Sequence, residues 1–132
     1  MNIDRRLEKA ERCLKTAALA SADDDHDAAC NRAYYAMFNA ARAALLALGQ
    51  HDLAMAKTHS GLIAAFGEHL VKSGKLPVEL GRSLAMESKR RLIGDYGGDS
   101  MSSSDADPAL LHATAFVEAI SSWLTRGGAQ AI

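Results

Sequence analysis

Apolar residues recur at steps of three and four along most of the chain, and this spacing constrains the fold more than any other feature of the sequence. In an α-helix these steps place side chains on one stripe, which packs against the rest of the protein. The first stripe contains Ile3, Leu7, Ala10 and Leu14. No segment shows the alternation of apolar and polar residues that is typical of β-strands. The sequence therefore predicts an all-α protein.

Glycine, proline and aspartate residues mark where the predicted helices begin and end. Gly49 ends an alanine-rich second helix, and Pro77 suits the first turn of the fourth, where its missing N–H costs nothing. Asp107 followed by Pro108 is typical of the cap and first position of a fifth helix. The first predicted helix starts near residue 3, and the second covers 27–48. The third runs from 58 or 60 to 73, the fourth from 77 to 93 and the fifth from 108 to 124. We expect a loop over 50–57 and a break over 94–107.

These helices predict one compact unit. With 132 residues, the chain has the length of a single domain. Five helices joined by short connections form an all-α bundle. We therefore expect a single helical domain over residues 1–132, with a core over about 3–126 and a loose tail over 127–132.

The charge balance and the cysteines limit the class of protein. Fifteen Lys and Arg residues against sixteen Asp and Glu residues give a net charge of −1, which excludes a protein that coats nucleic acid by bulk charge but not a local basic cluster. The chain shows neither the apolar run of a signal peptide nor the ~18 apolar residues of a membrane-spanning helix. Cys13 and Cys30 lie in helical patterns and are expected to be buried thiols. These features predict a cytoplasmic protein without a membrane segment.

The sequence carries no signature of a metal or cofactor site. The five histidines form no pair four residues apart, and neither cysteine belongs to a Cys-x-x-Cys motif. A P-loop, a dinucleotide-binding fingerprint and a nucleophile elbow are all absent from the sequence. The glycines of residues 94–98 follow a helix instead of a strand, so we interpret them as a helix end. We expect neither a metal ion nor a cofactor.

A polar and aromatic group on the second helix is the first candidate for a site. Asn31, Tyr35 and Phe38 share one helix face, and Arg32 is adjacent. Two interpretations remain open, because aromatic residues also anchor cores and interfaces. Packing accounts more readily for the aromatic residues than for Asn31 and Arg32, which could line a binding cleft.

The second candidate is the cationic end of the fourth helix. Cations at residues 89–91 complement the negative end of the helix dipole. This does not account for Arg91, because its spacing places it on the apolar stripe of Leu80 and Leu84. Asp95 lies one turn further on and can pair with Arg91. A partly buried guanidinium needs such a carboxylate or a phosphate, so a structural ion pair and a phosphodiester site both remain open.

Three ordered blocks resemble a known family. The order Asn-Arg-Ala-Tyr-Tyr-Ala-Met-Phe at 31–38, Lys-Thr-His-Ser-Gly-Leu at 57–62 and Arg-x-x-x-Asp-Tyr-Gly at 91–97 is similar to that of small prokaryotic HEPN-domain proteins. This resemblance implies an up-and-down bundle of four to five helices, commonly a homodimer, and frequent pairing with a minimal nucleotidyltransferase in toxin–antitoxin operons. Many members are metal-independent ribonucleases whose signature is an arginine followed, four to six residues later, by a histidine.

The chain departs from that signature. Residues 95–98 contain no histidine, and the next one, His112, belongs to the following helix. Histidine titrates near neutrality and suits acid–base catalysis, whereas Asp95 with an ordinary pKa near ~4 is a weak base and Tyr96 near ~10 a weak acid. His59 could approach from the third helix or simply begin it. The sequence alone leaves open whether the chain is an enzyme.

Three hypotheses follow. In the first, the chain is a toxin-like protein acting on RNA, in which Arg91 and Arg90 bind the scissile phosphate while Asp95 and Tyr96 position or activate the attacking hydroxyl. In the second, it is a non-catalytic subunit that binds a nucleotide or a nucleotidyltransferase, and Tyr96 resembles a tyrosine that such a partner modifies with AMP. In the third, it is a helical interaction module held together by the pair of Arg91 and Asp95. RNA or nucleotide binding is assigned to Asn31, Arg32, Tyr35, Arg90 and His59.

Overall fold

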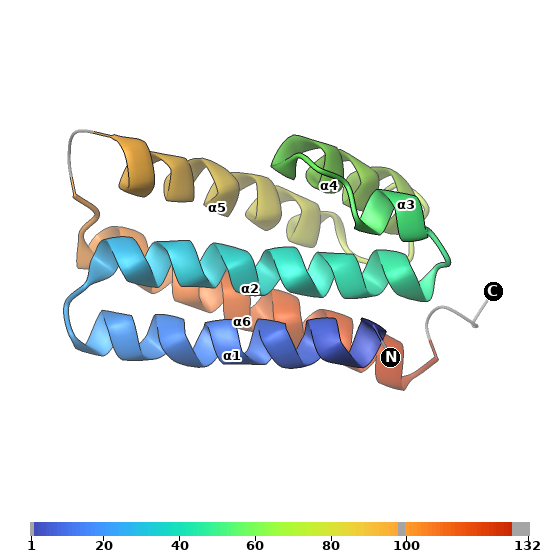
Figure 1. Cartoon of the computed structure of the whole chain (residues 1–132), viewed down its shortest axis with the longest axis horizontal. Helices are drawn as coiled ribbons and strands as arrows, with labels where there is room; N and C mark the ends of the chain where they lie inside the picture. The colour runs from blue at the N-terminus through green and yellow to red at the C-terminus, as the bar shows by residue number, and fades with distance from the viewer. Residues whose placement is uncertain (1, 98–99, 128–132) are drawn as a thin grey trace.

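The predicted all-α fold is confirmed by a computed structural model that describes residues 2–97 and 100–127 (Figure 1). Those two ranges contain no strand, and none of their helices combines the length and apolar composition that crossing a membrane requires. Gly98 and most of the predicted tail, 128–132, lie outside the described residues. The elements are α1 (Asn2–Ala22), α2 (His26–Ala47), α3 (His51–Ala54), α4 (His59–Phe66), the π-helical turn η1 (Gly67–Val71), α5 (Val78–Tyr96) and α6 (Ser103–Thr125).

Four long helices run up and down, and α2 lies at the centre of the bundle. In Figure 1, α1 and α2 lie side by side in opposite directions, α5 lies along the other side of α2, and α6 passes behind. Helix α2 contacts α1, α5 and α6. Side chains of α2 therefore meet those of α1 on one side and those of α4 and α5 on the other.

The composition of α2 explains its central place. Its alanines are buried, and small side chains allow neighbouring helices to approach closely. Larger core side chains such as Phe66 and Phe116, with ring centroids 5.2 Å apart, fill the space between α4 and α6. The buried alanines of α2 are Ala29, Ala33, Ala36, Ala40, Ala41, Ala43 and Ala44.

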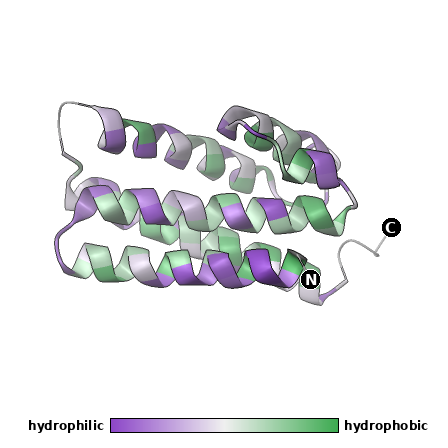
Figure 2. Cartoon of the chain, in the orientation of Figure 1, coloured by the Kyte–Doolittle hydropathy of each residue, from purple (hydrophilic) through white to green (hydrophobic). Residues whose placement is uncertain are grey.

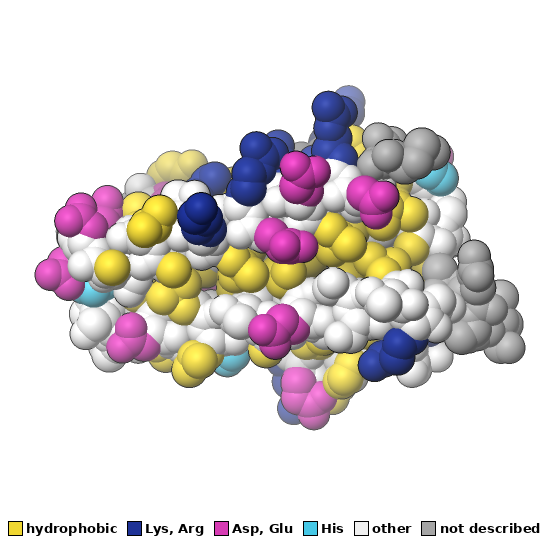
Figure 3. Space-filling view, turned by 90° about the horizontal axis from the view of Figure 1, so that it is seen from below, with side chains coloured by type: hydrophobic (Ala, Val, Ile, Leu, Met, Phe, Trp, Pro, Cys, Tyr) yellow, Lys and Arg dark blue, Asp and Glu magenta, His cyan; other side chains and the backbone are white. Residues whose placement is uncertain are grey.

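Within α1, hydrophilic residues are unevenly distributed. Figure 2 shows hydrophilic residues over the N-terminal half of α1 and more hydrophobic ones towards its C-terminal end. In Figure 3, which views the molecule from below, Lys and Arg side chains gather along the upper edge, while acidic side chains lie on the surface turned to the viewer. That upper edge is the front of Figure 1, where α1 meets α2.

The start of the last helix corrects one prediction. The sequence analysis places it at Asp107 and Pro108, but α6 begins at Ser103 and contains Pro108. The reason is a capping box: Ser102 caps the first turn, and the Asp105 side chain accepts from the Ser102 backbone N–H at 3.0 Å. These capping bonds stabilise an earlier start, despite the backbone hydrogen bond that Pro108 cannot make.

Three further segments differ from prediction. The stretch expected as a loop over 50–57 contains the short helix α3. The third predicted helix is continuous only in part, because it widens into η1, where Lys72 N donates to Gly67 O at 2.8 Å. The break expected at Gly94 is also wrong, since α5 continues to Tyr96.

The two cysteines are buried and unpaired, as predicted. Burial raises the pKa of the Cys30 thiol to about 11. A thiol with so high a pKa remains protonated at neutral pH and is a poor nucleophile. Cys30 is therefore part of the core.

Candidate functional site

Arg91 lies on the buried face of α5, where the helical spacing predicts it. Its side chain belongs to the same stripe as Leu80 and Leu84, and the residue is 7 % exposed. Its Nη1 donates to Asp95 Oδ2 at 3.2 Å, one helical turn away. The Asp95 side chain is 24 % exposed, so this ion pair lies at the edge of the core.

The same carboxylate joins α5 to α2. Asn31 Nδ2 donates to Asp95 Oδ2 at 3.0 Å. The Asn31 Oδ1 atom in turn accepts from Arg32 Nε and Nη2 at 2.9 and 2.8 Å. The structure therefore brings Asn31, Arg32, Arg91 and Asp95 into one chain of hydrogen bonds.

Two tyrosine rings of α2 lie beside the Arg91 guanidinium. Its central carbon is 5.2 Å from the ring centroid of Tyr34 and 5.7 Å from that of Tyr35, which is within the range of cation–π attraction. The Arg91 Nε is buried and has no hydrogen-bond partner among the described residues. Buried donors are normally paired. The unpaired Nε therefore indicates that the guanidinium still has a hydrogen bond to donate to a further oxygen.

His59 reaches the same cluster from α4. Thr58 caps this helix by accepting from Gly61 N at 3.0 Å, and Gly61 suits that turn because a Cβ there would lie 2.8 Å from Thr58 Oγ1. His59 Nδ1 and the Tyr34 hydroxyl are 2.7 Å apart. Tyr34 thus contacts both the Arg91 guanidinium and the His59 imidazole. We call Asn31, Tyr34, His59, Arg91 and Asp95 the Arg91 site.

The electrostatics of the site favour a neutral imidazole. Burial, and then the positive charges of Arg91 and Arg42, lower the pKa of His59 below its ordinary value of 6.5. Burial raises the pKa of Tyr34. At neutral pH the site therefore combines a permanent cation, an uncharged imidazole and a protonated phenol. This combination can bind an oxyanion and transfer a proton.

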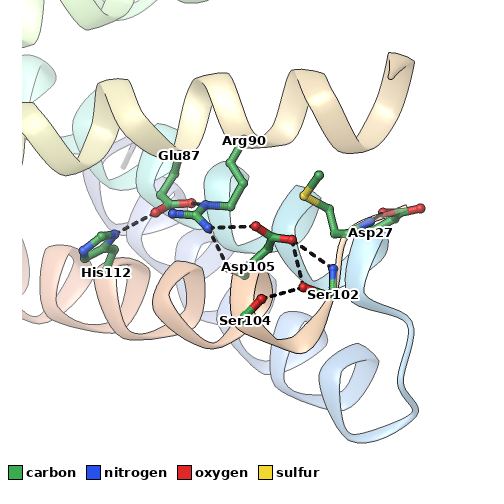
Figure 4. Close-up of polar contacts among 8 residues, drawn as sticks. Asp27, Glu87, Arg90, Ser102, Ser104, Asp105 and His112 are labelled. Carbon is green, nitrogen blue, oxygen red and sulfur yellow. Dashed lines mark hydrogen bonds and ion pairs between the residues drawn. The ribbon is translucent and has the colours of Figure 1, made fainter. Parts of the chain in front are cut away.

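Arg90, which the sequence analysis assigns to phosphate binding beside Arg91, lies outside this site. A step of one residue turns the side chain by about 100° around a helix, and Arg90 faces α6 (Figure 4). Its Nε donates to Glu87 Oε1 at 2.8 Å, and its Nη1 donates to Asp105 O at 3.1 Å. The other Glu87 oxygen lies 2.7 Å from His112 Nδ1. We call Glu87, Arg90, Asp105 and His112 the Arg90 network.

Tyr96 lies at the C-terminal end of α5, apart from the Arg91 site. Its side chain is 78 % exposed, and no hydrogen bond involves it among the described residues. Gly97 follows, and a Cβ at that position would lie 2.4 Å from Ile93 O. The phenol of Tyr96, the last residue of α5, is therefore exposed to solvent.

The sequence analysis did not include Arg42 or Tyr34 among the candidate site residues, although both lie beside residues that it named. The Arg42 guanidinium lies over the Phe38 ring, 4.4 Å from its centroid. Arg42 follows Phe38 by four residues, so helical spacing could have placed both on one face.

Within residues 2–97 and 100–127, no group of three or more histidine, cysteine or acidic side chains could hold a metal ion.

Comparison with known proteins places the site in context. The HEPN domain family matches residues 3–123, a range that includes the whole Arg91 site. A UPF0332 protein of Gloeobacter violaceus is 40 % identical over 105 residues, 80 % of each chain. A UPF0332 protein of Thermotoga maritima is 42 % identical over 89 residues, 67 % of this chain and 64 % of that protein. A Methanocaldococcus jannaschii protein named "Putative toxin MJ0605" is 31 % identical over 114 residues, 86 % of this chain and 82 % of that protein.

Proposed function

This chain belongs to the HEPN domain family, and on that premise we propose that it is a toxin-like protein that binds and cleaves RNA. The observation that carries the proposal is the buried Arg91 guanidinium, whose Nε lacks a partner while its neighbours hold it in place. Independence from a metal ion is part of the family resemblance. The relative named as a toxin supports the general role.

Arg91 would bind the scissile phosphate. When a 2′-hydroxyl attacks the adjacent phosphorus, negative charge grows on the non-bridging oxygens, and a cation fixed nearby stabilises it. Asp95 would act as a positioning residue, because its Oδ2 already accepts from both Asn31 and Arg91. Of the two roles that the sequence analysis left open for Asp95, positioning or activating the attacking hydroxyl, this proposal takes the first.

His59 would take the proton of the attacking hydroxyl. A base must be unprotonated at the working pH, and the lowered pKa of His59 meets this condition. In the tautomer whose Nδ1–H donates to the Tyr34 hydroxyl oxygen, Nε2 carries the free lone pair and would receive the proton. The new bond joins the 2′-oxygen to phosphorus, and the 5′-oxygen leaves with a proton from water. The expected products are a 2′,3′-cyclic phosphate and a 5′-hydroxyl.

The test compares two neighbouring cations of α5. Wild type, Arg91→Ala and Lys89→Ala are incubated with RNA and a chelator, and circular dichroism checks that each variant is folded. Loss of one preorganised donor costs about 10²–10³ in rate, so we expect Arg91→Ala to lose that much. Lys89 is exposed and outside the site, so Lys89→Ala is the matched control. Equal cleavage by both variants, or none by the wild type, contradicts the proposal.

The role of His59 has a separate readout. His59→Gln should lower the rate and abolish the decline in rate that protonation of the base produces at acidic pH. The cleavage products of the wild type, analysed by mass spectrometry, should carry cyclic phosphate ends. An unchanged pH–rate profile in His59→Gln would assign the base to another group.

A second function is favoured by the exposure of Tyr96. Its phenol is 78 % exposed and has no hydrogen-bond partner among the described residues, so a modifying enzyme could reach it. In this case the chain is a non-catalytic subunit of a nucleotidyltransferase. Co-expression with a minimal nucleotidyltransferase should then add the mass of AMP to the wild type but not to Tyr96→Phe. An unmodified wild type counts against this function.

We also propose that two copies of the chain pair. Leu92 and Ile93 are exposed on α5, next to Arg91. Exposed apolar side chains that are contiguous often mark interfaces. Light scattering should give the mass of a dimer, and Ile93→Asp should shift it to that of a monomer. A wild type that is monomeric at micromolar concentration would contradict the pairing.

A further inference from the structure

A groove between α1 and α2 is lined by positive charge. It consists of two adjoining cavities of about 320 and 250 Å³, which share Lys9, Cys13 and Arg32. Arg12 lines the first cavity and Arg42 the second. No carboxylate lines either cavity among the described residues. We call this feature, with its cations Lys9, Arg12, Arg32 and Arg42, the basic groove.

The charge is concentrated there although the chain as a whole carries −1. With 3.6 residues per turn, Lys9 and Arg12 lie about 60° apart on the side of α1 that faces the groove, and Asp4 and Glu11 lie about 80° or more from either. Glu8 lies between these two sets, about 40° from Arg12. Figure 3 shows the same separation, with Lys and Arg side chains along the upper edge and acidic side chains towards the viewer. Segregation of this kind raises the local positive potential.

The four cations of the basic groove lack acidic partners. Among the ion pairs of the described residues, none includes any of them. The Arg42 Nε is buried and makes no hydrogen bond there. Burial and the nearby charge of Arg6 both lower the pKa of Arg42. Like charges held together without counter-charges repel, so an anion bound in the groove would relieve this repulsion.

The shape and chemistry of the groove suit a single-stranded nucleic acid. Two guanidinium groups lie over aromatic rings, Arg32 at 5.0 Å from the Tyr35 centroid and Arg42 at 4.4 Å from that of Phe38. Single-strand sites combine cations that follow the backbone with flat groups on which bases stack. From Arg32 to Arg42 the helix rises by about 15 Å. An acidic peptide would use the charges but not the flat surfaces.

The basic groove is continuous with the Arg91 site. Arg32 donates to Asn31, and Asn31 and Arg91 both donate to Asp95. A second copy of this chain is a poor occupant, because a twofold contact through the groove would bring cations against cations. We propose that the basic groove holds the phosphates of single-stranded RNA on one side of the scissile bond. The choice of RNA rests on the proposed function.

Binding is tested apart from cleavage. The probe is a fluorescein-labelled 12-nucleotide 2′-O-methyl RNA, which lacks the attacking hydroxyl, and the readout is anisotropy at several salt concentrations. Lys9→Glu should weaken binding about tenfold and reduce the slope of log affinity against log salt by about 0.7. Lys15→Glu makes the same charge change on α1 but lies outside both cavities, so it is the matched control. Arg12→Glu repeats the test if Lys9→Glu does not fold.

The outcomes separate this proposal from the proposed function. If Lys9→Glu and Lys15→Glu bind equally well, the basic groove is not the site, even where cleavage depends on Arg91. If Lys9→Glu loses binding but the wild type cleaves no RNA, the groove stands and the nuclease assignment falls. If polyglutamate of equal charge competes as well as unlabelled RNA, the groove is a site for acidic protein and the proposal is overturned.

Discussion

Arg90 and Arg91 are neighbours in the sequence, but their surroundings differ in one decisive respect. In the Arg90 network, both oxygens of Glu87 are used, one by Arg90 and one by His112, and Arg90 has a second acceptor in Asp105. In the Arg91 site, the guanidinium has one acceptor, Asp95, and its Nε has none among the described residues. Burial alone therefore does not distinguish a structural arginine from a binding one. The number of donors without an acceptor does.

The difference also lies in where each arginine points. The Arg90 network connects α5 to α6 (Figure 4). Just before α6, Asp27 Oδ1 of α2 accepts a hydrogen bond from Met101 N at 2.7 Å. The Arg91 site lies between α2, α4 and α5 and continues into the basic groove. We expect substitutions in the first region to change stability and substitutions in the second to change binding. The following predictions test this division.

The largest effect on stability is expected at Glu87. Its side chain is 1 % exposed, and Glu87→Ala would leave Arg90 and His112 without their shared acceptor. Breaking a buried ion pair costs about 3–5 kcal/mol, and we expect about 3 kcal/mol because Arg90 is itself 19 % exposed. Urea denaturation followed by circular dichroism measures this loss. A loss below about 1 kcal/mol would mean that the network does not stabilise the bundle.

A smaller loss is expected at the start of α6. Ser102→Ala removes the cap, which costs about 1 kcal/mol at pH 7. Hydrogen bonds from the Ser102 N–H and hydroxyl lower the pKa of Asp105 below its ordinary value of 3.8. This contribution is present above pH 3.8 and is lost as the pH falls through the lowered pKa. The difference in stability between wild type and variant should therefore shrink at pH 3, and a constant difference would assign the loss to helix propensity alone.

Arg91→Met should change stability least among these three substitutions. The ion pair with Asp95 lies at the edge of the core, and Asp95 keeps its hydrogen bond from Asn31 when Arg91 is replaced. Replacement also removes the buried Nε that lacks an acceptor, and an apolar group of similar length can fill its space. We expect a change within about 0.5 kcal/mol in thermal denaturation. A loss as large as that of Glu87→Ala would make Arg91 a structural residue and favour the helical interaction module.

The sequence predicts more of the Arg91 site than of the Arg90 network, for a physical reason. Arg91, Asp95 and the aligned residues of α2 follow from spacing within single helices, which periodicity reports. The partners of Arg90, Asp105 and His112, lie on another helix, and their alignment depends on the packing of α5 on α6. The position of His59 beside Tyr34 likewise depends on how α4 lies against α2.

The helix boundaries show the same limit of local signals. Asp107 and Pro108 form a common start signal, yet the chain uses the capping box of Ser102 and Asp105, whose cap lies five residues earlier. Both signals are local, and the contact of Arg90 with Asp105 adds a long-range term that favours the earlier start. The capping box and this contact together favour the start of α6 at Ser103.

The finest test of the comparison is the titration of His59. Burial is the largest cause of its lowered pKa, and the charges of Arg91 and Arg42 add to it. Arg91→Met should therefore raise the pKa of His59 part of the way towards 6.5, whereas Lys89→Met should leave it unchanged. Histidine NMR signals followed between pH 4 and 8 measure both values. Because the unfolded chain binds this proton more readily than the folded one, wild-type stability should fall as the pH drops below 6.5 towards the lowered pKa. His59→Gln should remove that part of the decline. If Arg91→Met leaves the pKa of His59 unchanged, the two side chains do not interact electrostatically. His59 would then not be the base of the Arg91 site that the proposed chemistry requires.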